Sequence, residues 1–167
     1  SDVFVAGDLA RGYGRVNPAA AADWAAGLKD REYRAQAIGE ALGTWAATAP
    51  DAAIAFATGL EEPEFRQQAY DSIFAAMILQ NPQGGLDLLD QFPPSDKPAA
   101  VKAAVQNLAE YYPNIAAREL NQRADQFEDQ KAAGEIATTI AKSWVGSDSV
   151  EALKWATHLD HPILRET

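Results

Sequence analysis

The sequence predicts an all-α protein, a right-handed αα-superhelix (solenoid) of helical hairpins with a period of about 32 residues. Alanine, the best helix former, is the most abundant of the 167 residues. Val, Ile and Thr do not accumulate in the alternating runs that indicate strands. Prolines and large apolar residues recur at one spacing along the chain, which is typical of a repeat architecture.

Prolines mark where the first helix of each hairpin is expected to start. Four of them follow one another at nearly equal spacings, in the pairs Asn17-Pro18, Ala49-Pro50, Asn81-Pro82 and Tyr112-Pro113. Ser149 fits the same frame after a somewhat longer gap. Proline is favoured at the first position of a helix, and asparagine just before it is a good N-cap. We therefore expect a first helix after each of these five frame positions.

Two apolar columns follow in the first helices. The sixth residue after the frame position is Trp24, Phe56, Leu88 or Trp155, and the tenth is Leu28, Leu60, Phe92 or Leu159. Residues four apart share one face of a helix, as a packing stripe requires. The fourth unit instead has Glu119 and Arg123 in these columns, with Leu120 one place out of register. We therefore expect a break in regularity at about residues 118–130, with a longer, shifted or kinked first helix.

A third column defines the second helices. Five residues before each frame position stands Tyr13, Trp45, Met77, Leu108 or Trp144. The N-terminal stretch VAGDLARGYGRVNP aligns without a gap on AIGEALGTWAATAP. The chain is therefore expected to open on a second helix and to close on a first helix, from residue 148 to about 158. Residues 1–167 are interpreted as a single helical-repeat domain and as a fragment of a longer chain.

Units of this length resemble the αα-superhelical repeats, which include tetratricopeptide, HEAT and armadillo-like repeats. The first helix here has the pattern P-x5-W-x3-L, whereas a tetratricopeptide repeat has W-x2-L-G-x2-Y. Trp45 and Trp144 also stand where a tetratricopeptide repeat has a small residue. The sequence is more similar to alanine-rich bacterial repeats of the form DP-x-A-A-x3-W-A-x2-L, which are TPR-like or HEAT-like. This resemblance implies protein binding or scaffolding.

Charge and composition argue against several classes of function. The net charge of −10 disfavours nucleic acids, whose binding needs a basic face, and it also disfavours an anionic membrane surface. No apolar stretch approaches the ~18 residues of a membrane helix. Cysteine is absent, and the Gly-Tyr-Gly and Gly-Gly segments lack the strand and lysine of a phosphate-binding loop. We predict no nucleic-acid partner, no membrane insertion and no cofactor.

No arrangement of residues indicates catalysis, so we predict a non-enzyme without catalytic or metal-binding residues. His158 and His161, with Asp160 between them, could hold zinc, but Pro162 favours an exposed helix end and no third ligand is evident. Acidic clusters could serve hydrolysis or bind magnesium, although solvated surface is the favoured interpretation. These clusters are Asp87 with Asp90, Glu61 and Glu62 with Glu64, and Asp125 with Glu128 and Asp129.

The four tryptophans are expected to pack between hairpins, and the alternative is that they line a peptide groove. In a solenoid, side chains one place off the packing stripe of the first helices face the concave surface. Here these side chains are acidic early in the chain and basic late, a gradient that suits a partner segment of mixed charge. The candidate binding residues on this face are Asp23, Asp87, Arg118 and Lys154.

The leading hypothesis is a non-enzymatic protein–protein interaction or scaffold module with a protein or peptide as partner. A self-assembling structural solenoid is one alternative, because both ends are expected to expose apolar side chains. Candidates for end-to-end self-association are Val3, Val5 and Leu9 at one end and Trp155 and Leu159 at the other. A second alternative is the accessory domain of a larger enzyme.

Overall fold

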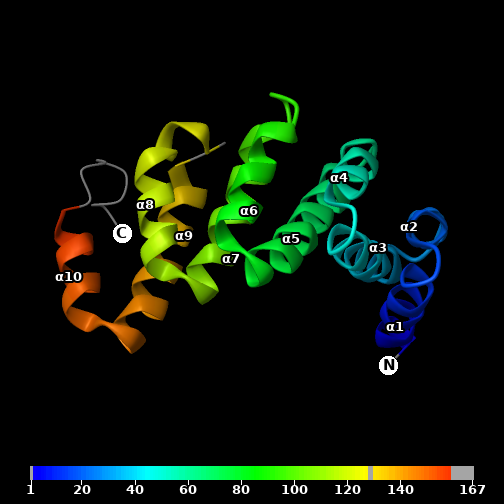
Figure 1. The fold of residues 1–167 in the computed structure, drawn as a ribbon, viewed down its shortest axis with the longest axis horizontal. Helices are drawn as coiled ribbons and strands as arrows, with labels where there is room; N and C mark the ends of the chain where they lie inside the picture. Colours follow the sequence, from blue (N-terminus) through cyan, green and yellow to red (C-terminus); the bar gives the residue numbers. More distant parts are fainter. Residues whose placement is uncertain (1, 128–129, 159–167) are drawn as a thin grey trace. The chain divides into compact units, whose positions relative to one another are not determined.

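The computed structural model describes residues 2–127 and 130–158, and in these residues it contains helices and no strand (Figure 1). The all-α prediction is therefore confirmed. The chain divides into two compact units, Ser1–Pro93 and Pro94–Thr167. The interpretation of residues 1–167 as a single helical-repeat domain stays a prediction.

In the first unit, short and long helices alternate. Helices α2 and α4 each pack against the long helix that follows, and α6 packs against α5. The long helices α1, α3 and α5 pack side by side, α1 on α3 and α3 on α5. The helices are α1 (Asp2–Gly14), α2 (Pro18–Ala26), α3 (Arg31–Ala46), α4 (Pro50–Thr58), α5 (Pro63–Gln80) and α6 (Pro82–Asp87), and α6 continues into the 3-10 helix η1 (Leu88–Gln91).

The second unit has the same alternation. Helix α7 packs against α8 and α9, and α9 packs against α10. The helices are α7 (Lys97–Tyr111), α8 (Pro113–Gln122), the 3-10 helix η2 (Ala124–Gln126), α9 (Gln130–Ser147) and α10 (Ser149–Thr157).

The helix starts that the prolines predict are confirmed. Helices α2, α4, α6 and α8 begin at their prolines, and α10 begins at Ser149. The N-cap of α2 is made as expected, since Asn17 Oδ1 accepts a hydrogen bond of 3.1 Å from the backbone N–H of Ala20. Asn81, by contrast, occupies the N-cap of α6 without a side-chain hydrogen bond to the helix. At α10, Asp148 caps the Glu151 N–H, and the Glu151 carboxylate pairs with Lys154.

The long helices of the first unit approach closely because glycine stands at their contacts. A Cβ atom added to Gly39 of α3 would lie 2.8 Å from Ser72 Oγ and 3.1 Å from Gln68 Nε2 of α5. A Cβ atom added to Gly7 of α1 would lie 3.1 Å from Gln36 Cγ of α3. Separations this short leave no room for a larger side chain, so small residues set the spacing of α1, α3 and α5.

An arginine ties each of two long helices to the loop that precedes it. Arg34 Nε donates a hydrogen bond of 2.6 Å to the Leu28 carbonyl, and Arg66 Nη1 donates one of 2.7 Å to the Leu60 carbonyl. The two arginines are 32 residues apart, as are the two carbonyl groups. Loop carbonyls that would otherwise lack a partner are thereby satisfied in the same way in two successive hairpins.

The predicted apolar columns pack against one another. Trp45 lies 6.0 Å from Phe56 between ring centroids, and Trp144 lies 6.0 Å from Trp155. The Phe92 ring contacts two rings of α5, Tyr70 edge-on at 5.0 Å and Phe74 stacked at 5.7 Å. Trp45, Trp144 and Trp155 are half-buried, which confirms packing as their role, whereas Trp24 is exposed.

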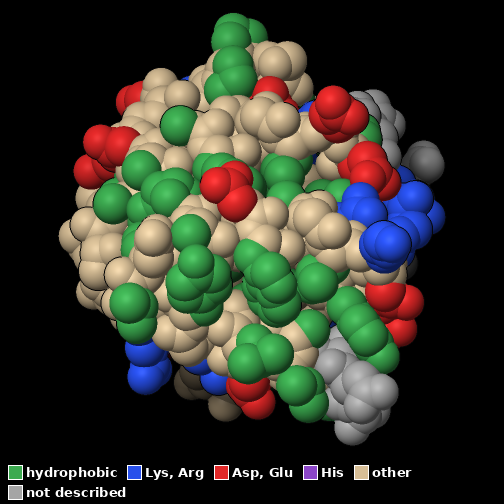
Figure 2. All heavy atoms as spheres, turned by 90° about the vertical axis from the view of Figure 1, so that its right-hand side faces the viewer, with side chains coloured by type: hydrophobic (Ala, Val, Ile, Leu, Met, Phe, Trp, Pro, Cys, Tyr) green, Lys and Arg blue, Asp and Glu red, His purple; other side chains and the backbone are tan. Residues whose placement is uncertain are grey.

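Apolar side chains are exposed on the outer face of α1, as predicted for this end. Val5 is 56% exposed and Leu9 is 58% exposed, and Phe4, Tyr13 and Trp24 are exposed as well. Figure 2 faces the side on which α1 and α2 lie in Figure 1, and apolar side chains gather near the middle of this view. The side chain of Val3 lies outside the described part of the structure.

The other end differs in detail from the prediction. Trp155 is half-buried rather than exposed, because its ring packs on Trp144, and Leu159 lies outside the described residues. Val145 of α9 and Val150 and Leu153 of α10 are exposed apolar side chains here, at 56%, 60% and 66%. Among the described helices, none is both long and apolar enough to span a membrane.

Replacing Gly39 by leucine should destabilise the protein by about 1–3 kcal/mol, the usual cost of overpacking, because the new side chain collides with Ser72 and Gln68. Gly12→Leu is the matched control, since a Cβ atom there meets nothing within 4 Å. Leucine in a helix is favoured over glycine, so this control should be neutral or more stable by up to about 1 kcal/mol. Urea unfolding followed by circular dichroism measures both. Equal stability of Gly39→Leu and the wild type would contradict the close approach of α3 and α5.

Candidate binding groove

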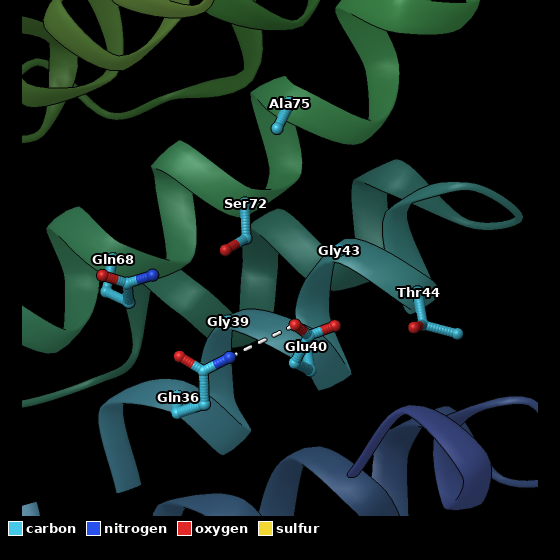
Figure 3. A pocket seen from close by; sticks show the side chains of 8 residues that line it. All are labelled: Gln36, Gly39, Glu40, Gly43, Thr44, Gln68, Ser72 and Ala75. Atoms are coloured by element: carbon cyan, nitrogen blue, oxygen red, sulfur yellow. Dashed lines mark hydrogen bonds between the residues drawn. The ribbon is translucent and has the colours of Figure 1, made fainter. Parts of the chain in front are cut away.

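A polar groove lies between α3 and α5 in the first unit. Its volume is about 330 Å³, and it is open to solvent. Figure 3 shows the side chains that line it, with Ser72 of α5 beside Gly39 and Gly43 of α3. The lining residues are Gln36, Gly39, Glu40, Gly43, Thr44, Gln68, Ser72 and Ala75.

Gly39 and Gly43, which let α3 and α5 approach closely, also line the groove. Gly39 is buried, and a Cβ atom on Gly43 would lie 3.3 Å from the backbone carbonyl oxygen of Ser72. Ser72 and Gln68 of α5 occupy the space that side chains at these two positions would need. Glycine often serves in this way where another chain or ligand approaches a backbone closely.

The polar lining is partly fixed by hydrogen bonds to α1. Glu40 Oε2 accepts hydrogen bonds from Arg11 at 2.9 Å from Nε and 2.8 Å from Nη2. Glu40 Oε1 accepts a bond of 3.3 Å from Gln36 Nε2. The hydrogen bond and the charge of Glu40 raise the pKa of Arg11 above its ordinary value, so the Arg11 guanidinium stays protonated. The Glu40 carboxylate is therefore held in place and largely neutralised.

The groove can donate and accept hydrogen bonds. Gln36 and Gln68 each carry an amide with two donors and an acceptor, and Thr44 and Ser72 each carry a hydroxyl. No group of three or more His, Asp or Glu side chains within the described residues could hold a metal ion. Side chains of these types suit reversible binding of a polar chain.

The structure places the four sequence-predicted site residues outside this groove. Asp23 is exposed on α2, and Asp87 is exposed at the end of α6, where its Oδ1 accepts a hydrogen bond of 2.9 Å from Gln83. In the second unit, Arg118 pairs with Glu119, and the Lys154 ammonium lies 2.6 Å from the Glu151 carboxylate. A binding role for Asp23, Asp87, Arg118 and Lys154 stays a prediction.

The groove lies on second helices, whereas the sequence predicted a binding surface on first helices. Sequence reasoning missed it because glycines and glutamines do not stand out in an apolar pattern. One signal was present, since Gln36 and Gln68 occupy the same place in successive hairpins. Their neighbours Gly39 and Gly43 are four residues apart and therefore share a helix face.

In the fourth unit, the charged residues Glu119 and Arg123 stand in the positions of the two apolar columns. Glu119 is 4% exposed and is the only charged residue buried within the described part of the chain. Arg118 donates to Glu119 Oε1 at 3.1 and 3.2 Å, and Arg123 Nε donates to Oε2 at 3.0 Å. Leu120 beside it is buried. Helix α8 starts at Pro113 and has 10 residues against 9 in α2 and α4, so it is neither shifted nor much longer than they are. What differs is the ion cluster, after which α8 ends at Gln122 and η2 follows.

His158 caps the C-terminal end of α10, in agreement with the favoured interpretation of an exposed helix end. Its backbone N–H bonds to the Trp155 carbonyl, and its Nδ1 lies 2.7 Å from the Lys154 carbonyl oxygen. Asp160, His161 and Pro162 lie outside the described residues.

Comparison of the chain with protein-family models, with curated proteins and with solved structures found no match.

Replacing Glu119 and Arg123 together by leucine should leave stability unchanged or raise it, because the pair then matches the apolar columns of the other units. Arg123→Leu alone should cost about 1–3 kcal/mol, since Glu119 stays buried with one arginine fewer. Thermal and urea unfolding of both variants measure the difference. A single variant as stable as the double variant would show that Arg123 does not compensate the buried charge.

Proposed function

We propose that this chain is a non-catalytic protein-binding module, a right-handed αα-superhelix built from the helical hairpins that the proline frame marks. In this proposal the groove between α3 and α5 binds an extended segment of a partner protein. The accessory domain of a larger enzyme remains a role that such a module could fill.

Recurrent contacts support the hairpin repeat. The helix starts follow the proline frame, and Arg34 and Arg66 bond to loop carbonyls that are themselves one repeat period apart. The Trp45–Phe56 and Trp144–Trp155 pairs join equivalent columns at the same centroid distance of 6.0 Å. Helical hairpins that pack in this way stack into solenoids, which commonly present binding surfaces.

The groove itself is the observation that carries the binding proposal. An extended peptide exposes unpaired backbone N–H and C=O groups, and burying them without partners is costly. The amides of Gln36 and Gln68 can bond to both kinds of group, and the hydroxyl of Ser72 adds a third polar contact. Gly39 and Gly43 add no side chain of their own to this lining.

The size and charge of the groove restrict the kind of segment. A volume of about 330 Å³ is at the small end of ligand sites, so a few residues with small side chains fit best. Because Glu40 is already paired with Arg11, the groove has no uncompensated charge to attract a strongly charged peptide. The proposal is therefore an uncharged, extended segment rich in small or polar residues.

Binding of such segments can be measured with an array of uncharged peptides, followed by calorimetry of the best binder. Gln36→Ala with Gln68→Ala should weaken binding at least about tenfold, because both amides are lost while alanine keeps the helices intact. Gln80→Ala is the matched control, an exposed glutamine at the end of the same helix α5 and outside the groove. If no peptide binds, or if the double variant binds as tightly as the control, the groove is not the binding site.

A further inference from the structure

The α1 face is an exposed apolar surface that the proposed groove does not use. We define it as Phe4, Val5, Leu9 and Tyr13 of α1 together with Trp24 of α2, all of which are exposed. Leu9, Tyr13 and Trp24 line an apolar hollow of about 330 Å³, and Figure 2 looks toward this end of the first unit. Contiguous exposed apolar surface of this kind marks an interaction site more often than isolated apolar residues do.

The interior of the same unit shows what covers an equivalent face. One repeat period further along the chain, Val5 and Leu9 correspond to Ala37 and Ala41 of α3, and both alanines are buried. Helix α1 lies against the side of α3 that carries Gln36 and Glu40, because a Cβ atom on Gly7 would lie 3.1 and 3.3 Å from their Cγ atoms. Helix α5 contacts Gly39 and Gly43, and Ala37 and Ala41 lie on roughly the opposite side of α3 from these glycines. A long helix with small residues at the contact therefore covers this face of α3.

The second unit also has a long helix, α9, and it exposes an apolar side chain. The proline frame aligns Trp45 with Trp144 and Phe56 with Trp155, so Ala46 corresponds to Val145 and Ile54 corresponds to Leu153. Ala46 and Ile54 are buried in the first unit. Val145 and Leu153 are exposed instead. We call this surface of α9 and α10 the α10 face.

The charges of the two faces are complementary at one further pair of positions. Within the first unit, Arg11 of α1 bonds to Glu40 of α3. In the same alignment, Lys142 of α9 takes the place of Arg11, and Asp8 of α1 takes the place of Glu40. Both Lys142 and Asp8 are exposed. If α9 of one molecule packed on α1 of another as α1 packs on α3, Lys142 would lie opposite Asp8. The two would then repeat the ion pair between Arg11 and Glu40.

We propose that the α10 face of one molecule docks on the α1 face of a second copy of this chain. Val145 and Leu153 lie over the hollow lined by Leu9, Tyr13 and Trp24, and Lys142 pairs with Asp8. The contact joins two different surfaces, so it is heterologous and leaves one face free at each end of a dimer. The inference does not depend on the polar groove, because no residue of either face lines it.

Two single variants and their mixture test this arrangement by sedimentation velocity over a range of protein concentrations. Leu9→Glu changes only the α1 face and Leu153→Glu changes only the α10 face, so each alone should weaken self-association at least about tenfold. An equimolar mixture should form a heterodimer, because each variant keeps the face that the other has lost. Leu79→Glu is the matched control, an exposed leucine of α5 that lies in neither face and should leave association unchanged.

Each other outcome overturns the proposal. A wild-type chain that stays monomeric up to about 1 mM shows that the faces do not bind, since a weaker contact would be below the range of specific association. Association lost in Leu9→Glu and kept in Leu153→Glu indicates a symmetric contact between two α1 faces. Failure of the mixture to form a heterodimer excludes a heterologous contact. Circular dichroism verifies folding, and Leu9→Gln with Leu153→Gln replace any glutamate variant that loses helicity.

A charge exchange tests the alignment of the two faces independently. Asp8→Lys alone and Lys142→Asp alone should each weaken association a few-fold at low salt, because exposed ion pairs contribute little. The chain with both changes should associate as the wild type does, since the pair is then reversed. If the double variant associates more weakly than either single variant, Asp8 and Lys142 do not face one another.

Discussion

Where α3 crosses α5, a Cβ atom on Gly39 would lie 2.8 Å from Ser72 Oγ, so the two helices lie closer than most side chains permit. The same kind of contact brings α1 onto α3 at Gly7. Dispersion and apolar burial favour this arrangement, because interiors are packed as densely as organic crystals. Several other features of the first unit depend on it. The close packing of the long helices buries Ala37 and Ala41 and leaves a groove between α3 and α5. It also determines which side of α1 stays exposed to solvent.

The short helices are fixed to the long ones by a second set of contacts. Ring pairs such as Trp45–Phe56 contribute the apolar part, and they are tilted rather than parallel, as aromatic quadrupoles favour. The arginine bonds to loop carbonyls contribute the polar part. In the fourth unit, Glu119 occupies an apolar column and needs two arginines around it. A buried carboxylate is tolerated there because its oxygens are paired.

The groove and the two end faces differ in chemistry, and this difference bears on what each can do. Hydrogen bonds to glutamine amides exchange for bonds to water, so their net contribution is small and they favour selectivity over strength. Apolar side chains such as Leu9 and Leu153 gain free energy roughly in proportion to the area removed from water. A net charge of −10 opposes association of identical chains, so the ends can associate only if the apolar contact outweighs this repulsion.

The sequence by itself determined that the protein is all-helical and where the short helices begin. Pro18, Pro50, Pro82 and Pro113 each begin a helix, and the tryptophan columns pack as their spacing indicated. These features are local, since N-caps, proline geometry and helical periodicity act within one helix or one hairpin. Sequence also indicated the exposed side of α1 and the irregularity near Glu119.

The tertiary structure alone decided which surfaces the long helices leave open. The groove depends on contacts between residues of successive hairpins, such as Gly39 with Ser72, and no local pattern specifies such a distance. The burial of Trp155 depends in the same way on its ring contact with Trp144 of the preceding helix. Periodicity shows which side of a helix is apolar, but the neighbouring helix and its distance are set by the packing of complete side chains.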